Sequence, residues 1–342
     1  MKVRVLPLQP HCFAFGGFEL QMLSVLEAVR ECGVDAQPMD VWSRDADFEV
    51  LHVWGLSVAH AATLYWARQS GKGAVMTALL PYRTVERRVR HLAAMLAGQG
   101  RLRRKLLDMV DVLVVVNEAQ AESACLMLGM PRERIAVIPH IIAAPYFEQP
   151  GEGAAPADVS DSYVLCTGNV CARKNQINLA KACLAVGCPL VIIGDVLPGE
   201  ERYGEALARL IERRSPIRWL PGMPAGSPDL VEAYRNCRIF ALPSREETQP
   251  IGALEAAAAG KPVLIGDRPY ARQKYYRNAC LVDTGSAKSI ESGLRAVLAE
   301  PNRYVAPVDV LAECRDKRVG AAYKRVYEMA QDTPTRGVRN GT

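Results

Sequence analysis

The chain has 342 residues, 49% of them hydrophobic, and this length is more than one compact core needs, so it predicts two domains. The net charge of +5, from 42 basic and 37 acidic residues, is too small to indicate nucleic-acid binding. The opening MKVRVLPLQ is typical of a strand and not of a signal peptide, and no apolar run approaches the roughly 20 residues of a membrane helix, so we expect a cytoplasmic protein.

Strand-like and helix-like segments alternate through the first half, which predicts a Rossmann-like domain over residues 1–145. The expected strands are Lys2–Leu8, Val50–Trp54, Ala74–Leu79, Val112–Val116 and Ile135–Ile138. The expected helices are Glu19–Cys32, Val58–Gln69 and Glu118–Leu128. A Pro-, Gly- and Ala-rich stretch then predicts an interdomain linker at residues 146–160.

The second half restarts the same alternation and predicts a further Rossmann-like domain over residues 161–318. Its expected strands are Tyr163–Thr167, Leu190–Gly194, Ile217–Trp219, Ile239–Leu242 and Pro262–Ile265. Its expected helices are Gln176–Val186, Glu200–Arg213, Asp229–Cys237 and Ile251–Ala259. Residues 319–342 predict a last helix, expected to pack back on the first domain, and a polar tail. Together these segments predict an α/β protein with two Rossmann-like β/α/β domains facing a central cleft.

The ten cysteines are scattered through apolar segments without a CxxC pair, so we expect them to be reduced core residues. Cys183 and Cys188 are separated by four residues, but no second cysteine pair or histidine accompanies them, so a zinc site is not expected. No Asp-x-Asp segment is assigned here as a metal-binding motif. We therefore expect neither a metal ion nor any other cofactor.

The run SREETQPIGALEAAAAGKPVLIG holds the strongest functional pattern in the chain. It begins at the end of a predicted strand, where ligands bind in a parallel α/β sheet, and places Glu247 in the loop and Glu255 on the following helix. The start of that helix offers free backbone N–H groups at Ile251, Gly252 and Ala253, which can bind a diphosphate. The two carboxylates, separated by seven residues, can bind sugar hydroxyls. The sequence thus predicts a nucleotide-sugar site.

With these segments in view, the chain resembles the GT-B glycosyltransferases, especially the retaining enzymes of family four. The resemblance rests on segments spread over nearly the full length: Gly16–Ala36, Leu128–Phe147, Thr167–Ala182, Asp229–Leu264 and Tyr275–Ser286. The fourth is the most specific, because it joins a strand, a loop, two glutamates at fixed spacing and a Gly-x-Pro-Val turn in order.

The resemblance implies roles for particular residues. Glu247 would contact the hydroxyls of the transferred sugar, and Glu255 the ribose of the nucleotide. Lys174 and, beside it, Arg173 would contact the donor diphosphate. The implied donor-binding backbone positions are Gly16, Gly17, Gly168 and Asn169. Alternatively, Glu247 is a solvated acid in a loop, Glu255 is an acid favoured at the start of a helix, and Lys174 is a surface lysine. A plain turn is the alternative at the two early glycines.

Two departures from the family pattern bear on activity. Asn169 stands where the family usually has an arginine, and no histidine follows the predicted strand Ala74–Leu79. These losses leave two hypotheses open. The first is a retaining, metal-independent glycosyltransferase that moves a sugar from a UDP- or GDP-linked donor to a saccharide or lipid-linked acceptor in polysaccharide or glycoconjugate biosynthesis. The second is a non-catalytic sugar-nucleotide-binding or partner subunit with the same fold.

A basic stretch in the first half exceeds the whole positive surplus of the chain. Its cations are Arg83, Arg87, Arg88, Arg90, Arg101, Arg103, Arg104 and Lys105. They alternate with leucines and alanines, which predicts an amphipathic helix on an anionic membrane surface, with the protein peripheral on its inner face. A solvated helical face is the alternative. No nucleic-acid partner is expected, because only Tyr82 lies nearby as a stacking aromatic.

Overall fold

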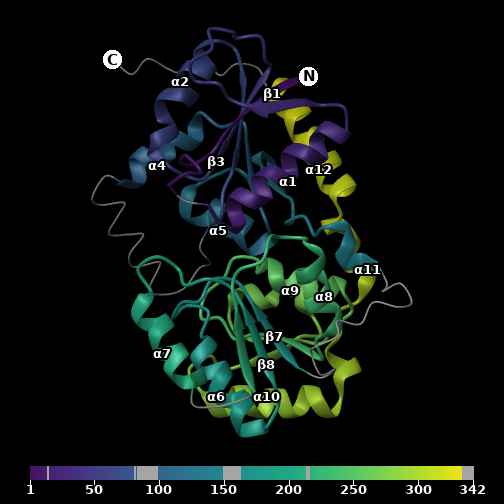
Figure 1. The fold of residues 1–342 in the computed structure, drawn as a ribbon. Coiled ribbons are helices and arrows are strands. Elements are labelled where there is room, and N and C mark those ends of the chain that lie inside the picture. The colour runs from purple at the N-terminus through teal and green to yellow at the C-terminus, as the bar shows by residue number, and fades with distance from the viewer. Residues whose placement is uncertain (14, 81, 83–98, 149–162, 213–215, 333–342) are drawn as a thin grey trace. The chain divides into compact units, whose positions relative to one another are not determined.

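The computed structural model describes residues 1–13, 15–80, 82, 99–148, 163–212 and 216–332 (Figure 1). These residues fall into two compact units. The first comprises Met1–Ile141 together with Glu313–Thr342, and the second comprises Ile142–Ala312. Each unit contains one six-stranded sheet in which every pair of neighbouring strands is parallel.

The sheet of the first unit has the strand order β2-β1-β3-β4-β5-β6. Its strands are β1 (Lys2–Leu6), β2 (Asp35–Pro38), β3 (Val50–Trp54), β4 (Gly73–Thr77), β5 (Val112–Val115) and β6 (Ile135–Val137). The α-helices described in this unit are α1 (Gly17–Glu31), α2 (Ala61–Gln69), α4 (Gln99–Asp108), α5 (Glu118–Leu128) and α12 (Asp316–Asp332). Strands β3, β4 and β5 are buried along their whole length, as expected for central strands covered on both faces.

Helix α12 returns the chain to the first unit, where it packs along α1 (Figure 1). Gly320 makes this approach close, because a Cβ atom at this position would collide with the Ala28 carbonyl of α1. Tyr323 and Tyr327 of the same helix are buried and join the core of the unit. The expected packing of the last helix on the first domain therefore has a specific contact in the structure.

The sheet of the second unit has the strand order β12-β11-β10-β7-β8-β9. Its strands are β7 (Val164–Thr167), β8 (Leu190–Ile193), β9 (Ile217–Leu220), β10 (Ile239–Leu242), β11 (Val263–Gly266) and β12 (Cys280–Val282). Its α-helices are α6 (Gln176–Val186), α7 (Glu201–Glu212), α8 (Pro228–Asn236), α9 (Ile251–Ala258), α10 (Ala287–Ala299) and α11 (Val308–Leu311). The chain order crosses between β7 and β10 at the middle of this sheet, which is the position where α/β sheets bind ligands.

The expected α/β class with two Rossmann-like domains is confirmed, although the units divide the chain at other residues than expected. The first unit ends at Ile141 and resumes at Glu313. Tyr146, the first residue of the expected linker, is buried against Tyr234 of α8, so it belongs to the core of the second unit. Residues 149–160 of that linker lie outside the described residues. Among the described helices, none is both long and apolar enough to cross a membrane.

Candidate functional site

The loop after β7 has an unusual backbone conformation at each end. Gly168 has φ +107, a conformation that favours glycine, and a Cβ atom there would lie 3.2 Å from Nζ of Lys174. Asn175 immediately precedes α6 with φ 66, a left-handed conformation that asparagine tolerates better than most residues. The loop therefore folds back on itself, with the Lys174 ammonium beside the Gly168 backbone.

Asn175 also ties this loop to two other loops at the carboxyl edge of the sheet. Its buried side-chain amide donates to the Pro243 carbonyl at 3.2 Å and to the Thr284 carbonyl at 2.9 Å. Pro243 follows β10, and Thr284 follows β12. No sequence pattern singles out Asn175, yet this one side chain holds the loop that carries Arg173 and Lys174.

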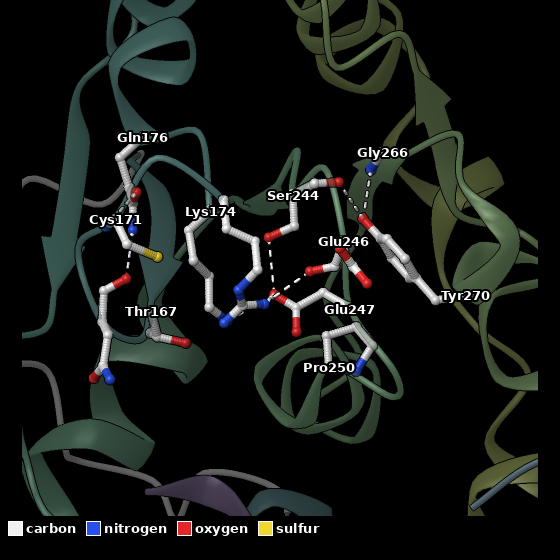
Figure 2. Close-up of polar contacts among 12 residues, drawn as sticks. Thr167, Cys171, Lys174, Gln176, Ser244, Glu246, Glu247, Pro250, Gly266 and Tyr270 are labelled. Carbon is white, nitrogen blue, oxygen red and sulfur yellow. Dashed lines mark hydrogen bonds and ion pairs between the residues drawn. The ribbon is translucent and has the colours of Figure 1, made fainter. Parts of the chain in front are cut away.

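Three donor groups surround a single carboxylate oxygen of Glu247 (Figure 2). Its Oε1 accepts from Ser244 Oγ at 2.9 Å, lies 2.9 Å from an Arg173 guanidinium nitrogen and 3.0 Å from Lys174 Nζ. The Glu247 side chain is only 10% exposed. Burial opposes its ionisation, but the Lys174 and Arg173 cations outweigh burial and lower the pKa of the carboxyl. The group is therefore a buried, ionised carboxylate.

Backbone contacts also join the two loops that carry this cluster. Arg173 donates through its guanidinium to the Glu246 carbonyl at 2.8 Å, and its own carbonyl accepts from the Arg245 N–H at 2.9 Å. Figure 2 shows the Lys174, Ser244 and Glu247 side chains converging. The three residues predicted to contact the donor's sugar and diphosphate thus lie together: Glu247, Lys174 and Arg173.

Glu255 lies apart from that cluster, in the core beneath α9. Its Oε2 accepts from the Tyr234 hydroxyl at 2.8 Å, and that hydroxyl is 2.6 Å from Thr167 Oγ1. Tyr146, whose ring packs edge-on against Tyr234, brings a second buried hydroxyl close to the carboxyl. Burial raises the pKa of Glu255 to about 7, although both tyrosine hydroxyls oppose this rise. The Tyr234 hydroxyl therefore holds the predicted ribose ligand, and the sequence indicated neither this contact nor the nearby Tyr146.

Fewer backbone N–H groups at the start of α9 are free to bind a ligand than the sequence predicts. The Ala253 N–H is already engaged, because it donates to the Pro250 carbonyl at 3.1 Å. For the Ile251 and Gly252 N–H groups the described residues provide no hydrogen bond, as is usual in the first turn of a helix. Gly252 has a second role, since a Cβ atom there would lie 2.6 Å from Thr167 Oγ1 and 2.9 Å from the Tyr234 hydroxyl. Asn169 is exposed beside this edge of the sheet.

The other predicted residues belong to the first unit. Gly16 precedes α1 in an extended conformation and donates its N–H to Glu19 Oε2 at 2.9 Å, and Gly17 is the first residue of the helix. A phosphate at this position would have to displace the Glu19 carboxylate. Arg101 belongs to α4, and Arg103, Arg104 and Lys105 are exposed on it. The remaining cations of the basic stretch, Arg83, Arg87, Arg88 and Arg90, lie outside the described residues.

The structure also bears on metal binding. In the described part of the chain, no three His, Cys, Asp or Glu side chains are grouped so that they could hold a metal ion. An Asp-x-Asp sequence does occur in the first half, at Asp45 and Asp47. Both residues are exposed, and the Asp47 carboxylate pairs with the Lys2 ammonium.

The clustered residues all fall within one recognisable segment. Residues 161–300 match the family model of the glycosyl transferases group 1. This range contains the Glu247 cluster, Glu255 and the start of α9. Residues 161–300 are therefore similar to the glycosyl transferases group 1 family. The expected resemblance to the GT-B glycosyltransferases is thereby confirmed.

A curated relative and two solved structures extend the likeness beyond this matched segment. The D-inositol 3-phosphate glycosyltransferase of Segniliparus rotundus is 25% identical over 221 residues, which are 61% of this chain and 48% of that protein. The chain thus spans about half the length of this relative. A glycosyltransferase from Rickettsia africae superposes with a TM-score of 0.71 at 12% identity, covering 97% of this chain and 99% of that one. Anabaena HepE in complex with UDP and glucose gives 0.69 at 13% identity, with the same coverage. At these identities the two structures show a shared fold.

Proposed function

We propose that this chain is a retaining, metal-independent glycosyltransferase. It takes a sugar from a UDP- or GDP-linked donor and transfers it to a saccharide or lipid-linked acceptor, as in polysaccharide or glycoconjugate biosynthesis. The observation that carries the proposal is the Glu247 cluster. One buried carboxylate meets two cations at the carboxyl edge of a parallel sheet, inside the segment similar to the glycosyl transferases group 1 family.

The cluster suits a donor that carries both negative charge and hydroxyl groups. Lys174 and Arg173 can bind diphosphate oxygens, with Arg173 able to do so in a bidentate way. Because these cations now neutralise Glu247, donor binding would replace one anion by another. The Glu247 carboxylate would then be available to accept hydrogen bonds from sugar hydroxyls. The diphosphate would thus take over the pairing with the two cations.

The proposed chemistry needs no nucleophile from the protein. The acceptor hydroxyl attacks the sugar carbon on the face that the nucleoside diphosphate leaves, and the leaving phosphate takes the hydroxyl proton. The protein contributes positioning and positive charge where the departing diphosphate gains negative charge. Lys174 and Arg173 supply that charge, and the Ile251 and Gly252 N–H groups add donors from the start of α9.

We also propose that the protein docks reversibly on an anionic membrane surface through α4, on the cytoplasmic side. Arg103, Arg104 and Lys105 are exposed there, beside Leu102, which is 49% exposed. The next residues, Leu106 and Leu107, are buried in the core. Near its end the helix is therefore anchored in the core, and the preceding turn presents cations to solvent, each worth about 1 kcal/mol near such a surface.

The experiment that tests the function is thermal unfolding against a panel of nucleoside diphosphates and nucleotide sugars. A ligand at 100 times its dissociation constant adds roughly 2.7 kcal/mol to the free energy of unfolding. We expect stabilisation by one nucleotide family, weakened in Lys174→Ala and retained in Lys181→Ala, whose side chain is exposed on α6. No stabilisation by any member would refute donor binding. Binding without sugar transfer to any acceptor would favour the non-catalytic subunit, which the glycosyl transferases group 1 match does not favour.

A further inference from the structure

Helix α6 ends in a motif that places two thiols side by side. Gly187 has φ 79, and its N–H donates to the Cys183 carbonyl at 2.9 Å. The Cys188 N–H donates to the same carbonyl at 3.1 Å. This pair of hydrogen bonds defines a Schellman-type ending, in which the residue after the left-handed glycine contacts the residue five positions earlier. Here both residues of that contact are cysteines.

The side chain of Cys188 contacts Cys183, as its backbone does. Cys188 Sγ donates to the Cys183 carbonyl oxygen at 3.8 Å, and the two neighbouring thiols influence each other's pKa. Cys183 is fully buried, whereas Cys188 is only partly buried. A reagent in solution can therefore reach one sulfur of the pair and not the other.

The surroundings of Cys188 favour its thiolate. The neighbouring Cys183 thiol lowers the pKa of Cys188, and the Arg238 and Arg295 cations add smaller contributions in the same direction, while partial burial opposes them. Arg295 is held at the end of α6, since it donates to the Ala185 carbonyl at 3.1 Å. Arg238 is tied to α10, where it donates to the Leu298 carbonyl at 3.4 Å. A partly exposed cysteine in an electropositive environment is the usual setting of a reactive thiol.

The other cysteines lack this combination. All ten are free thiols in the structure. Cys166 and Cys171 also influence each other, but both are fully buried, so no reagent reaches them. Cys125 is partly exposed on α5, and no cysteine among the described residues interacts with it. It therefore provides a control for simple exposure.

We propose that Cys183 and Cys188 are a reversible redox pair, oxidised to an internal disulfide by small disulfides of the glutathione type. The Cys188 thiolate attacks one sulfur of the small disulfide and releases one small thiol, which gains the proton that Cys188 lost. The Cys183 sulfur then attacks Cys188 Sγ, loses its own proton and releases the second small thiol. Two protein thiols are oxidised, and one small disulfide is reduced to two thiols.

The test treats the folded protein with oxidised glutathione, alkylates the remaining thiols and digests without reductant. Residues 182–202 form one tryptic peptide that contains both cysteines and no other, so the internal disulfide appears as an unalkylated peptide lighter by two hydrogens. We expect this product in the wild-type protein, and its reversal by a dithiol reductant. A wild-type peptide with both thiols alkylated, or with a persistent glutathione adduct, would overturn the proposal.

Single substitutions separate the two sulfurs. In Cys183→Ser the adduct on Cys188 should accumulate, because the resolving thiol is gone, and Cys183→Ala serves if the serine variant does not fold. In Cys188→Ser neither adduct nor disulfide should form. The peptide containing Cys125 should never show an internal disulfide. An adduct on Cys183 in Cys188→Ser would contradict the assigned order of attack.

The result of the oxidation test does not depend on whether the proposed donor site is correct. Helix α6 has 11 residues and spans about 16 Å. The cysteines lie at its end, and Lys174 precedes its start. We therefore expect oxidation to leave stabilisation by nucleoside diphosphates unchanged, so a redox pair can be present or absent whether or not the donor site is correct.

Discussion

The Tyr234 hydroxyl donates a 2.8 Å hydrogen bond to Glu255 Oε2, and this contact holds a carboxyl group inside the second unit. Since that proton is given to Glu255, the 2.6 Å contact on the other side of Tyr234 must be a donation from Thr167 Oγ1. A chain of three side chains therefore runs from β7 through α8 to α9. It orients the carboxyl that the sequence assigns to the donor ribose.

Glu255→Gln should stabilise the protein above neutral pH. The pKa of Glu255 is about 7 in the folded protein and 4.5 ordinarily, so between these pH values the folded state retains a proton that the unfolded state has lost. The free energy of unfolding therefore falls as pH rises through this range, by about 3 kcal/mol at pH 8. The amide removes this loss and still accepts from Tyr234. Denaturant unfolding at pH 5 and pH 8 measures both variants.

Glu212→Gln is the matched control for this experiment, because Glu212 is exposed on α7 in the same unit. It should leave the pH dependence as in the wild-type protein. If Glu255→Gln shows the wild-type pH dependence, Glu255 is not a buried titrating group. If Glu255→Gln is more stable but binds the donor more weakly, the Glu255 carboxyl lowers stability and serves donor binding.

Tyr234→Phe should weaken donor binding without removing any group expected to touch the donor. The substitution deletes the hydroxyl that orients Glu255 and leaves Thr167 Oγ1 without its acceptor, and a hydrogen bond to a charged group contributes about 1.5–3 kcal/mol. We expect about a tenfold loss in affinity. Because the Tyr234 hydroxyl opposes the rise in the Glu255 pKa, the pH dependence of donor binding should also shift upward.

Tyr163→Phe controls for loss of a buried tyrosine hydroxyl in the same unit, because the Tyr163 hydroxyl donates to the Ala233 backbone carbonyl at 2.7 Å. It should alter stability and leave the pH dependence of donor binding unchanged. Equal pH profiles for Tyr234→Phe and Tyr163→Phe would show that Tyr234 contributes packing alone.

The sequence predicted the central strands well, since runs such as Ile239–Leu242 are buried on both faces and read as continuous apolar segments. It did not indicate β2 and β12, which are short strands at the edges of their sheets. The family resemblance placed Lys174, Arg173 and Glu247 in one site, but it did not predict their ion pairs, because only the neighbouring positions of β7 and β10 bring these loops together. Tyr146 and Tyr234 carry no local pattern, so their contact with Glu255 required the folded chain.

Replacing the basic residues Arg87, Arg88, Arg103 and Arg104 together should release the protein from anionic liposomes. Two of them are exposed on α4, and the other two lie outside the described residues. With about 1 kcal/mol per charge near the surface, the loss of four cations should lower the partition coefficient by at least a hundredfold at low salt. Co-sedimentation with vesicles of anionic and of neutral lipid measures it. Sedimentation that is unchanged by the substitutions would rule out docking through this stretch.

Glu247→Ala should abolish sugar transfer with little effect on folding, because water can reach the Arg173 side chain, which is 43% exposed, and occupy the space that the carboxylate leaves. Lys174→Ala should weaken donor use. Full activity in both variants would refute the assignment of the site.

Glu247→Gln should separate diphosphate binding from sugar binding. In the wild-type protein the Glu247 carboxylate occupies the two cations that the diphosphate needs, at 2.9 Å and 3.0 Å. The amide removes this competing charge, so we expect a nucleoside diphosphate without sugar to bind about tenfold more tightly, roughly 1.4 kcal/mol. The sugar-bearing donor should gain less affinity, because it loses a contact to its hydroxyls.

Titration calorimetry with both ligands measures this difference. The control is Ser244→Ala, which removes a neutral donor to the same oxygen. Weaker binding of the bare diphosphate to Glu247→Gln would show that Glu247 organises the cations for the donor and does not compete with it.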